Sequence, residues 1–162
     1  EYGSRDGLLH NAASLGQMAP IEHYDIGTWT AVMHINLTAP FVLTKMLFPM
    51  LRASTDATVL FATSSVGRQG RAFWGAYAVS KFGVEGLAQV LADETNEATN
   101  IRVNCLNPGA TRTAMRRRAY PGEDAARLAA PADLMPAYLY LMGPDSTGVT
   151  GRSFDCQPVA KG

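Results

Sequence analysis

The sequence predicts an α/β protein in which helices flank a parallel β-sheet of the Rossmann-like kind. Short apolar segments alternate along the chain with longer segments of helical periodicity, which is typical of strand–helix–strand units. Small and polar residues follow directly after three of the apolar segments, as they do where strands end beside a binding site. With 162 residues, of which 47% are hydrophobic and 17% charged, we expect residues 1–162 to form a single domain.

The first half of the chain predicts two strands with a long helix between them. Residues 6–13 (DGLLHNAA) and 57–63 (ATVLFAT) are short apolar runs and predict buried strands. Asp25 is a suitable N-cap for the helix, whose apolar residues recur every three or four positions up to residue 52. Because Pro40 interrupts this pattern, we expect a kink or break near residues 36–40.

The second half predicts a helix over 76–94, a strand over 101–109 and a helix near 132–142. A last strand is expected within 148–156, GVTGRSFDC. The helix over 76–94 carries a one-sided stripe of apolar and glycine residues: Val79, Phe82, Gly83, Gly86, Leu87, Val90 and Leu91.

Composition argues against several classes of function. The formal net charge is zero, so we expect no nucleic-acid partner, and no apolar run approaches 18 residues, so we expect no membrane span. The first ten residues do not resemble a signal peptide. Cys105 and Cys156 are far apart and are expected to be reduced packing residues of a cytoplasmic protein rather than a disulfide. His10, His23 and His34 lack metal-ligand spacing, and no metal is expected.

Tyr77 and Lys81 are candidates for acid–base chemistry where the strands end. A spacing of four residues puts both on one face of the predicted helix, one turn apart. Free tyrosine has a pKa of about 10, and a nearby ammonium group lowers it. The pair therefore suits proton transfer near neutral pH. The alternative is a surface tyrosine beside a solvated lysine.

Ser64 and Asn36 extend this candidate site. Ser64 lies where the second strand ends, thirteen residues before Tyr77, so its hydroxyl can donate to a substrate oxygen on which charge develops. The alternative is a turn or capping serine, the interpretation we favour for Ser65. Asn36 lies at the expected helix break. Its amide can hold a water towards Lys81, or it can satisfy the carbonyl groups of the broken helix.

These residues resemble the signature of the short-chain dehydrogenase/reductase family. Ser64, Tyr77, Ser80 and Lys81 match the family's serine followed thirteen residues later by Y-x-x-x-[S]-K. Asn36 matches the structural asparagine. Asn11-Ala12-Ala13 nearly matches N-A-G, and Pro108, Gly109 and Thr113 match P-G-x-x-x-T. The motifs occur in the family's order and cover essentially the whole chain.

The resemblance implies hydride transfer between a nicotinamide cofactor and a carbonyl or alcohol substrate. Tyr77 would be the acid–base residue, Lys81 would lower its pKa and bind the nicotinamide ribose, and Ser64 would polarise the substrate oxygen. Asn36 would anchor a relay water. The cofactor is NADP or NAD, NADP being slightly favoured, and its contacts would come from Asn11, Ala12, Ala13, Tyr77, Lys81, Pro108, Gly109, Thr111 and Thr113.

The family's glycine-rich motif T-G-x-x-x-G-x-G does not occur in the sequence. The segment that carries it in the family precedes N-A-G. We therefore expect these residues to be the C-terminal two thirds of a longer, Rossmann-type chain, with the first strands and the glycine-rich loop lacking. The activity of residues 1–162 by themselves is left open. The alternative function is an inert fragment, or a non-enzymatic dinucleotide-binding or regulatory protein of the same fold.

Substrate and subunit contacts are expected in three further places. The family's mobile lid corresponds to residues 114–130, where Arg116, Arg117 and Arg118 would attract an anionic substrate or form a solvated helix face. Phe73 and Trp74 would either line the pocket or pack elsewhere. The family also implies a homodimer or tetramer through the helices near 25–52 and 77–97, where glycines would allow close approach.

Overall fold

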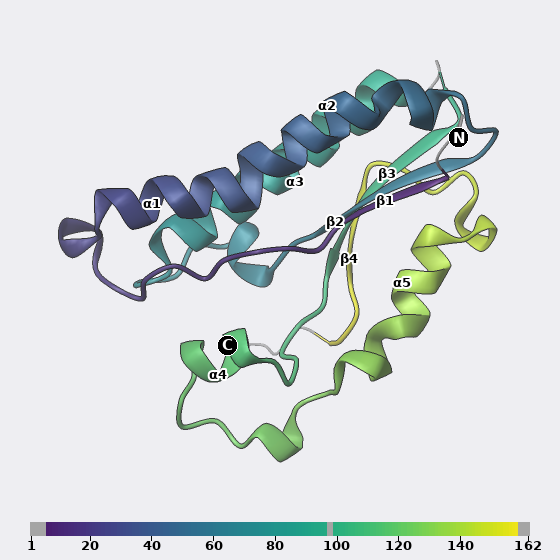
Figure 1. Ribbon diagram of the computed structural model, residues 1–162. Coiled ribbons are helices and arrows are strands. Elements are labelled where there is room, and N and C mark those ends of the chain that lie inside the picture. Colours follow the sequence, from purple (N-terminus) through teal and green to yellow (C-terminus); the bar gives the residue numbers. More distant parts are fainter. Residues whose placement is uncertain (1–5, 97–98, 159–162) are drawn as a thin grey trace.

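The computed structural model describes residues 6–96 and 99–158 and contains a four-stranded, fully parallel sheet in the order β1-β2-β3-β4 (Figure 1). The strands are β1 (Gly7–His10), β2 (Ala57–Ala62), β3 (Ile101–Asn107) and β4 (Arg152–Asp155). The predicted α/β class and the alternation of strands and helices are confirmed. β1 forms one edge of this sheet, and its Leu9 is 41% exposed.

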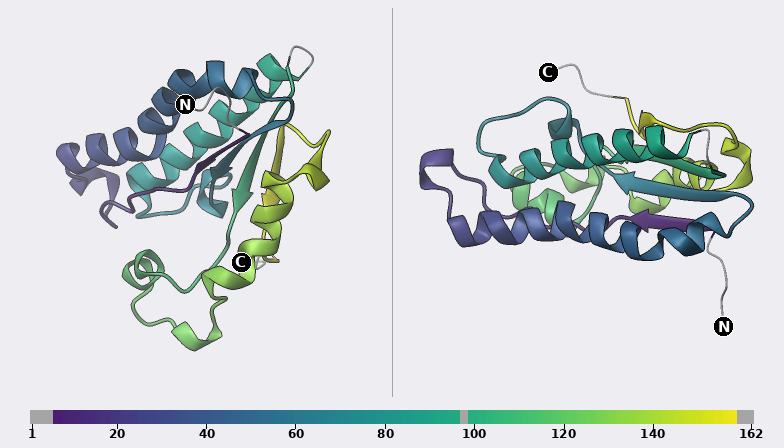
Figure 2. Two further views of the ribbon diagram at one scale, coloured as in Figure 1. Left: turned by 45° about the vertical axis from the view of Figure 1, so that its right-hand side comes forward. Right: turned by 90° about the horizontal axis from the view of Figure 1, so that it is seen from above.

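Helices cover both faces of the sheet. One face carries α1 (Ile26–Met33), a π-helical turn (His34–Thr38), α2 (Ala39–Arg52) and α3 (Gly75–Thr95), and Figure 2 shows this layer in two further views. The other face carries α5 (Met135–Met142), while α4 (Ala114–Ala119) lies beyond the carboxyl ends of the strands. Short 3-10 turns occupy Ile21–His23, Ser65–Gly67, Ala125–Arg127, Pro131–Leu134 and Pro144–Ser146.

The long first helix begins where the sequence predicts but does not break. Asp25 caps it by accepting a hydrogen bond from the Thr28 backbone N–H, at 2.6 Å from Oδ2. Pro40 has no N–H to donate, and the π-helical turn His34–Thr38 lies immediately before it, so the helix continues into α2. The expected break is thus a π bulge in a continuous helix.

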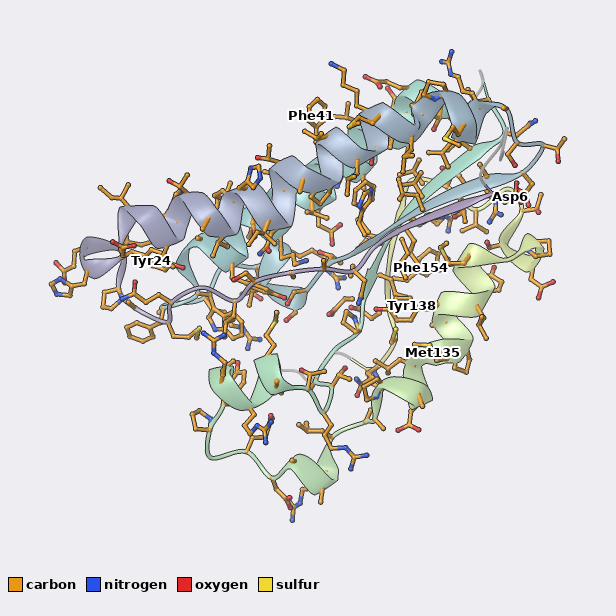
Figure 3. The ribbon with its side chains drawn as sticks, in the orientation of Figure 1. Asp6, Tyr24, Phe41, Met135, Tyr138 and Phe154 are labelled. Carbon is orange, nitrogen blue, oxygen red and sulfur yellow. The ribbon has the colours of Figure 1, made fainter. Side chains whose placement is uncertain are left out.

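Two apolar layers hold the sheet between its helices. Every residue of β2 and β3 is buried, as expected for central strands that are covered on both faces. Phe61, Val84 and Val103 belong to the layer under α2 and α3, whereas Leu60 and Tyr138 belong to the layer under α5. Figure 3 shows Tyr138 between α5 and the sheet.

The predicted apolar stripe of α3 lies largely on the side away from the sheet. Val79, Phe82 and Val90 are 44%, 46% and 57% exposed, whereas Tyr77, Lys81 and neighbouring small residues face inward. Small inward residues let the helix approach the sheet closely. Gly83 serves packing within the chain, because a Cβ there would lie 2.6 Å from Leu37 Cδ2.

Among the described residues, one helix, Ile26–Arg52, is long and apolar enough to cross a membrane by length and composition alone. The mean hydropathy of its 18-residue window is 1.3, and 22% of that window is buried. Polar residues interrupt this stretch, so the sequence contains no continuous apolar run of that length. Core helices of soluble proteins pass the same test, and the finding is weak evidence for a membrane.

Candidate active site

The candidate site lies at the carboxyl ends of β1, β2 and β3. A small cavity of about 100 Å³ opens there, with Ser64, Trp74 and Tyr77 on the wall formed by β2 and α3. Residues that follow β3 supply the other wall, among them Gly109, Thr111 and Thr113. The structure therefore brings Ser64 and Tyr77 to one cavity, although thirteen residues separate them in the sequence.

Gly67 explains how the serine loop lies so close to α3. Ser64 is in extended conformation, and a 3-10 turn follows it over Ser65–Gly67. A Cβ on Gly67 would lie 2.8 Å from Lys81 Cβ and 2.9 Å from the Lys81 carbonyl carbon. Only glycine therefore allows this loop to rest against the turn of α3 that carries Lys81.

Tyr77 and Lys81 are both buried, 8% and 3% exposed respectively. Burial raises the pKa of Tyr77, and a hydrogen bond with the Ser64 side chain partly offsets this. Lys81 Nζ donates to the Ala62 carbonyl oxygen at 2.7 Å and lies 5.7 Å from the centroid of the Tyr77 ring. Burial lowers the pKa of Lys81 to about 8, so the ammonium form predominates at neutral pH.

The pKa of Tyr77 is raised in this structure, whereas the sequence predicts that it is lowered. The spacing predicts that Lys81 lowers the pKa of Tyr77, whereas in this structure loss of hydration outweighs every other effect. The reason is geometric: the ammonium group lies against the Ala62 carbonyl and the ring. Ser64 is the residue that favours the phenolate here.

Asn36 joins the segment after β1 to the helices. Its Oδ1 accepts from the Ser14 N–H at 2.7 Å, and its Nδ2 donates to the Ser14 carbonyl at 2.9 Å and to Ser80 Oγ at 3.0 Å. The expectation that Asn36 satisfies broken helix carbonyls is wrong, because its partners lie outside that helix. Both amide N–H groups are engaged, so a water at this side chain would donate to Oδ1.

A polar network that the sequence analysis missed joins the serine loop to the ends of β3 and β4. Arg68 forms a bidentate ion pair with Asp155, in which Nη1 is 3.1 Å from Oδ2. Asn107 donates to Asp155 Oδ1 at 2.7 Å and accepts from the Gly109 N–H at 3.0 Å. Arg68 holds the pKa of the Asp155 carboxyl below its usual range. The network fixes the serine loop relative to the loop after β3.

The loop after β3 is held by its own contacts. Gly109 has φ +74°, a conformation that favours glycine, and Gln157 Nε2 donates to the Pro108 carbonyl at 2.7 Å and the Ala110 carbonyl at 3.1 Å. The Thr111 hydroxyl donates to the Gly109 carbonyl at 3.2 Å. Thr113 caps α4 by accepting from the Arg116 N–H at 3.1 Å.

The remaining predicted cofactor residues follow β1. Asn11 lines a third cavity, of about 390 Å³, together with Pro108, Thr111 and Thr113. Ala12 is exposed, and Ala13 is half-buried against the cluster that contains Tyr77. Lys81, unlike Tyr77, lines none of these cavities.

Three cavities adjoin one another across this end of the sheet. Thr111 and Thr113 line both the cavity beside Asn11 and the small cavity at Tyr77. Ser64, Trp74 and Gly109 line both the small cavity and a neighbouring one of about 350 Å³. This second cavity, the larger of the two that Ser64 lines, is called the larger cavity below. The shared lining residues make the three cavities one continuous surface at the carboxyl ends of the strands.

The lining of the larger cavity shows which of the three arginines at 116–118, and which of Phe73 and Trp74, lie at the pocket. Arg116 lines it, whereas Arg117 and Arg118 do not, and Arg118 Nη2 donates to the Gly16 carbonyl at 3.4 Å. Trp74 also lines it, while Phe73 is 55% exposed. Arg116 and Trp74 therefore belong to the larger cavity, and Arg117, Arg118 and Phe73 do not.

The fold and this site define an α/β protein of the Rossmann type with a serine and a tyrosine at one cavity. A family model described as short chain dehydrogenase matches residues 1–124. The chain belongs to the short-chain dehydrogenase/reductase family.

Individual relatives agree with this assignment. The chain is 53% identical over 160 residues to the uncharacterized oxidoreductase YciK of Escherichia coli K12, an alignment covering 99% of this chain and 63% of the relative. A short-chain dehydrogenase structure from Shigella flexneri, complexed with NADP, is 54% identical with a TM-score of 0.94, covering 97% of this chain and 65% of that one. A third, from E. coli CFT073 with NADPH, has the same identity, TM-score and coverages. The chain thus spans less than two thirds of its relatives' length.

Proposed function

We propose that the full chain, meaning the natural polypeptide that carries residues 1–162, reduces a carbonyl compound with NADPH or catalyses the reverse oxidation. The observation that carries this proposal is the shared cavity of Ser64 and Tyr77, where the tyrosine is buried and lies one helical turn from Lys81. An acid beside a hydroxyl donor is the arrangement that carbonyl reduction requires.

Tyr77 is the proton donor in this proposal. In reduction its phenol gives a proton to the carbonyl oxygen, and in oxidation its phenolate takes a proton from the alcohol. Ser64 donates a hydrogen bond to the same oxygen and stabilises the negative charge that develops there. Lys81, which is mainly charged at neutral pH, would stabilise the phenolate that Tyr77 leaves behind once its ammonium group turns from the Ala62 carbonyl towards the tyrosine oxygen.

Asn36 acts through position in this proposal. It holds Ser14 and Ser80, and Ser80 Oγ also donates to the Tyr77 carbonyl at 2.7 Å. The side chain thereby aligns the start of α3 with the segment after β1. A relay water, if bound at Asn36, would use the remaining acceptor position of Oδ1.

The nicotinamide cofactor, when bound, supplies or accepts the hydride. We assign its contacts to Asn11, Ala12, Ala13, Tyr77, Lys81, Pro108, Gly109, Thr111 and Thr113. NADPH is preferred over NADH because similar structures from S. flexneri and E. coli are complexed with NADP and NADPH. The adjoining cavities support a continuous cofactor surface on six of these residues, Asn11, Tyr77, Pro108, Gly109, Thr111 and Thr113.

We further propose that the protein is a cytoplasmic homodimer or tetramer that contacts its copy through the helices near 25–52 and 77–97; residue 97 lies outside the described residues. The support is apolar exposure on both helices: Phe41 and Met46 on α2 are 48% and 70% exposed, and Phe82 on α3 is 46% exposed. Figure 3 shows Phe41 on the outer side of α2. Cys105 and Cys156 are both free, in keeping with a reducing compartment.

Titration of the full chain with NADPH and NADH, followed by nucleotide fluorescence, tests the proposal. We expect saturable binding, tighter for NADPH, followed by nucleotide oxidation when a panel of aldehydes and ketones is added. Binding of neither nucleotide would exclude the oxidoreductase function. Binding without oxidation of nucleotide by any carbonyl compound would favour the alternative, a regulatory dinucleotide-binding protein.

A further inference from the structure

We propose that the substrate carries an anionic group, a carboxylate or a phosphate, which Arg71 binds at the rim of the larger cavity; this inference rests on the proposed function. The cavity, of about 350 Å³, is lined by Ser64 at one side and by Arg71, Trp74, Arg116 and Tyr120. Its volume is suited to a small metabolite. Among the described residues, the only charged side chains that line it are these two arginines.

Arg116 is part of the wall. Its guanidinium pairs in a bidentate manner with Glu123, with Nε–Oε2 and Nη2–Oε1 distances both 2.6 Å. The guanidinium carbon also lies 3.9 Å from the centroid of the Tyr120 ring. Its charge is therefore compensated and its position fixed, so it adds little net attraction for an anion.

Arg71, unlike Arg116, has no ion-pair partner among the described residues. Its side chain is exposed, and none of the ion pairs within residues 6–96 and 99–158 includes it. No carboxylate side chain belongs to the described lining of the cavity. Within residues 6–96 and 99–158, Arg71 therefore gives the cavity a positive charge with no carboxylate beside it, and a guanidinium is well shaped for bidentate pairing with a carboxylate or phosphate.

The segment that carries Arg71 is held in place by its backbone. The Trp74 N–H donates to the Arg71 carbonyl at 3.3 Å, and Phe73 adopts φ +71°. Gly75 has φ +27°, and a Cβ there would lie 2.4 Å from Tyr24 Cε2. These contacts keep Trp74 and Arg71 at the same cavity as Ser64, so one molecule can reach both the serine and the arginine.

The anionic group takes no part in the electron transfer. The carbonyl carbon gains the hydride, the carbonyl oxygen gains one proton from Tyr77, and the carboxylate or phosphate is unchanged. The inferred role of Arg71 is to select and orient the substrate. The substrate class is accordingly that of oxo acids and phosphorylated carbonyl compounds, or the corresponding hydroxy compounds.

Paired substrates test this inference on the full chain with NADPH. Oxo carboxylates with the ketone at positions 2 to 6 are each compared with their methyl esters, and dihydroxyacetone phosphate with dihydroxyacetone. We expect kcat/KM to favour the anion by roughly 10- to 100-fold in at least one pair, the range of a charged hydrogen bond. The preferred class of pair distinguishes carboxylate from phosphate.

Two variants complete the test. Arg71→Gln should bring the anion-to-neutral ratio of kcat/KM close to one, chiefly through KM, and Arg71→Lys should restore part of it. Arg117→Gln, on exposed α4 and outside the cavity, is the matched control and should keep the ratio. Calorimetry of the preferred anion with the NADPH complex should show the same loss of affinity.

The outcomes separate this inference from the proposed function. Reduction of neutral carbonyl compounds with no anion preference in any pair overturns the role of Arg71 and leaves the proposed function standing. An anion preference that persists in Arg71→Gln also overturns it. If no carbonyl compound is reduced and calorimetry detects no anion binding, both are wrong.

Discussion

Replacement of Asn36 by alanine should destabilise the full chain by about 3 kcal/mol. The side chain is 1% exposed and makes three hydrogen bonds, two with the Ser14 backbone and one with Ser80 Oγ. Each typically contributes about 0.5–1.5 kcal/mol, so their joint loss costs roughly 1.5–4.5 kcal/mol. Asn36→Asp should be at least as damaging, because its carboxylate would face the Ser14 carbonyl in a buried position.

Urea unfolding followed by circular dichroism measures this effect. Thr38→Ala is the matched control, since Thr38 lies in the same π-helical turn, is exposed and should change stability by less than about 0.5 kcal/mol. A loss below about 1 kcal/mol for Asn36→Ala would refute the positioning role. Unchanged stability together with a large loss of kcat would instead support the water-relay role.

Three other perturbations have defined outcomes. His10 is 9% exposed, and burial lowers its pKa from 6.5 to about 4, so the unfolded chain takes up the proton at a higher pH than the folded one. About 3 kcal/mol of stability should therefore be lost as the pH falls from 6.5 to 4. Urea unfolding over a pH series should show this loss in the parent and a smaller one in His10→Gln. If the proposed interface exists, Phe82→Glu should lower the mass of the oligomer measured by light scattering, and an unchanged mass would count against that interface. Asp155→Asn should lower kcat several-fold, because Arg68 no longer holds the serine loop. The free energy of unfolding should fall by only about 1 kcal/mol, since both side chains are partly exposed. A kcat equal to that of the parent would contradict this.

Much of the fold could be predicted because the signals are local. Apolar runs and N-caps identify the strands and the start of the first helix, and the alternation of elements leads to a parallel sheet. The shared cavity of Ser64 and Tyr77 also agrees with the spacing rule that singled them out. The side of α3 that faces the sheet is harder to predict from the sequence, because the apolar residues Val79 and Phe82 are exposed rather than buried.

The rest of the site depends on contacts between distant parts of the chain. Arg68 and Asp155 are 87 residues apart and meet only because the loop after β2 and the end of β4 both lie at the carboxyl end of the parallel sheet. The pKa of Tyr77 depends on burial and on where the Lys81 ammonium lies, which the spacing of four residues does not specify. Gly67 is the one local signal, a glycine three residues after Ser64, that close reading of the sequence could have used.

Nucleotide oxidation by the Tyr77→Phe variant tests the central claim most directly. The full chain and the variant are compared for NADPH binding by fluorescence and for NADPH oxidation with the preferred carbonyl compound, and Tyr140→Phe, at an exposed tyrosine of α5, is the control. The account predicts that NADPH binding weakens by no more than about tenfold, the loss of one hydrogen bond, and that kcat falls by roughly 100- to 10,000-fold for Tyr77→Phe alone. A Tyr77→Phe enzyme that retains kcat within about tenfold of the parent would contradict the assignment of Tyr77 as the proton donor.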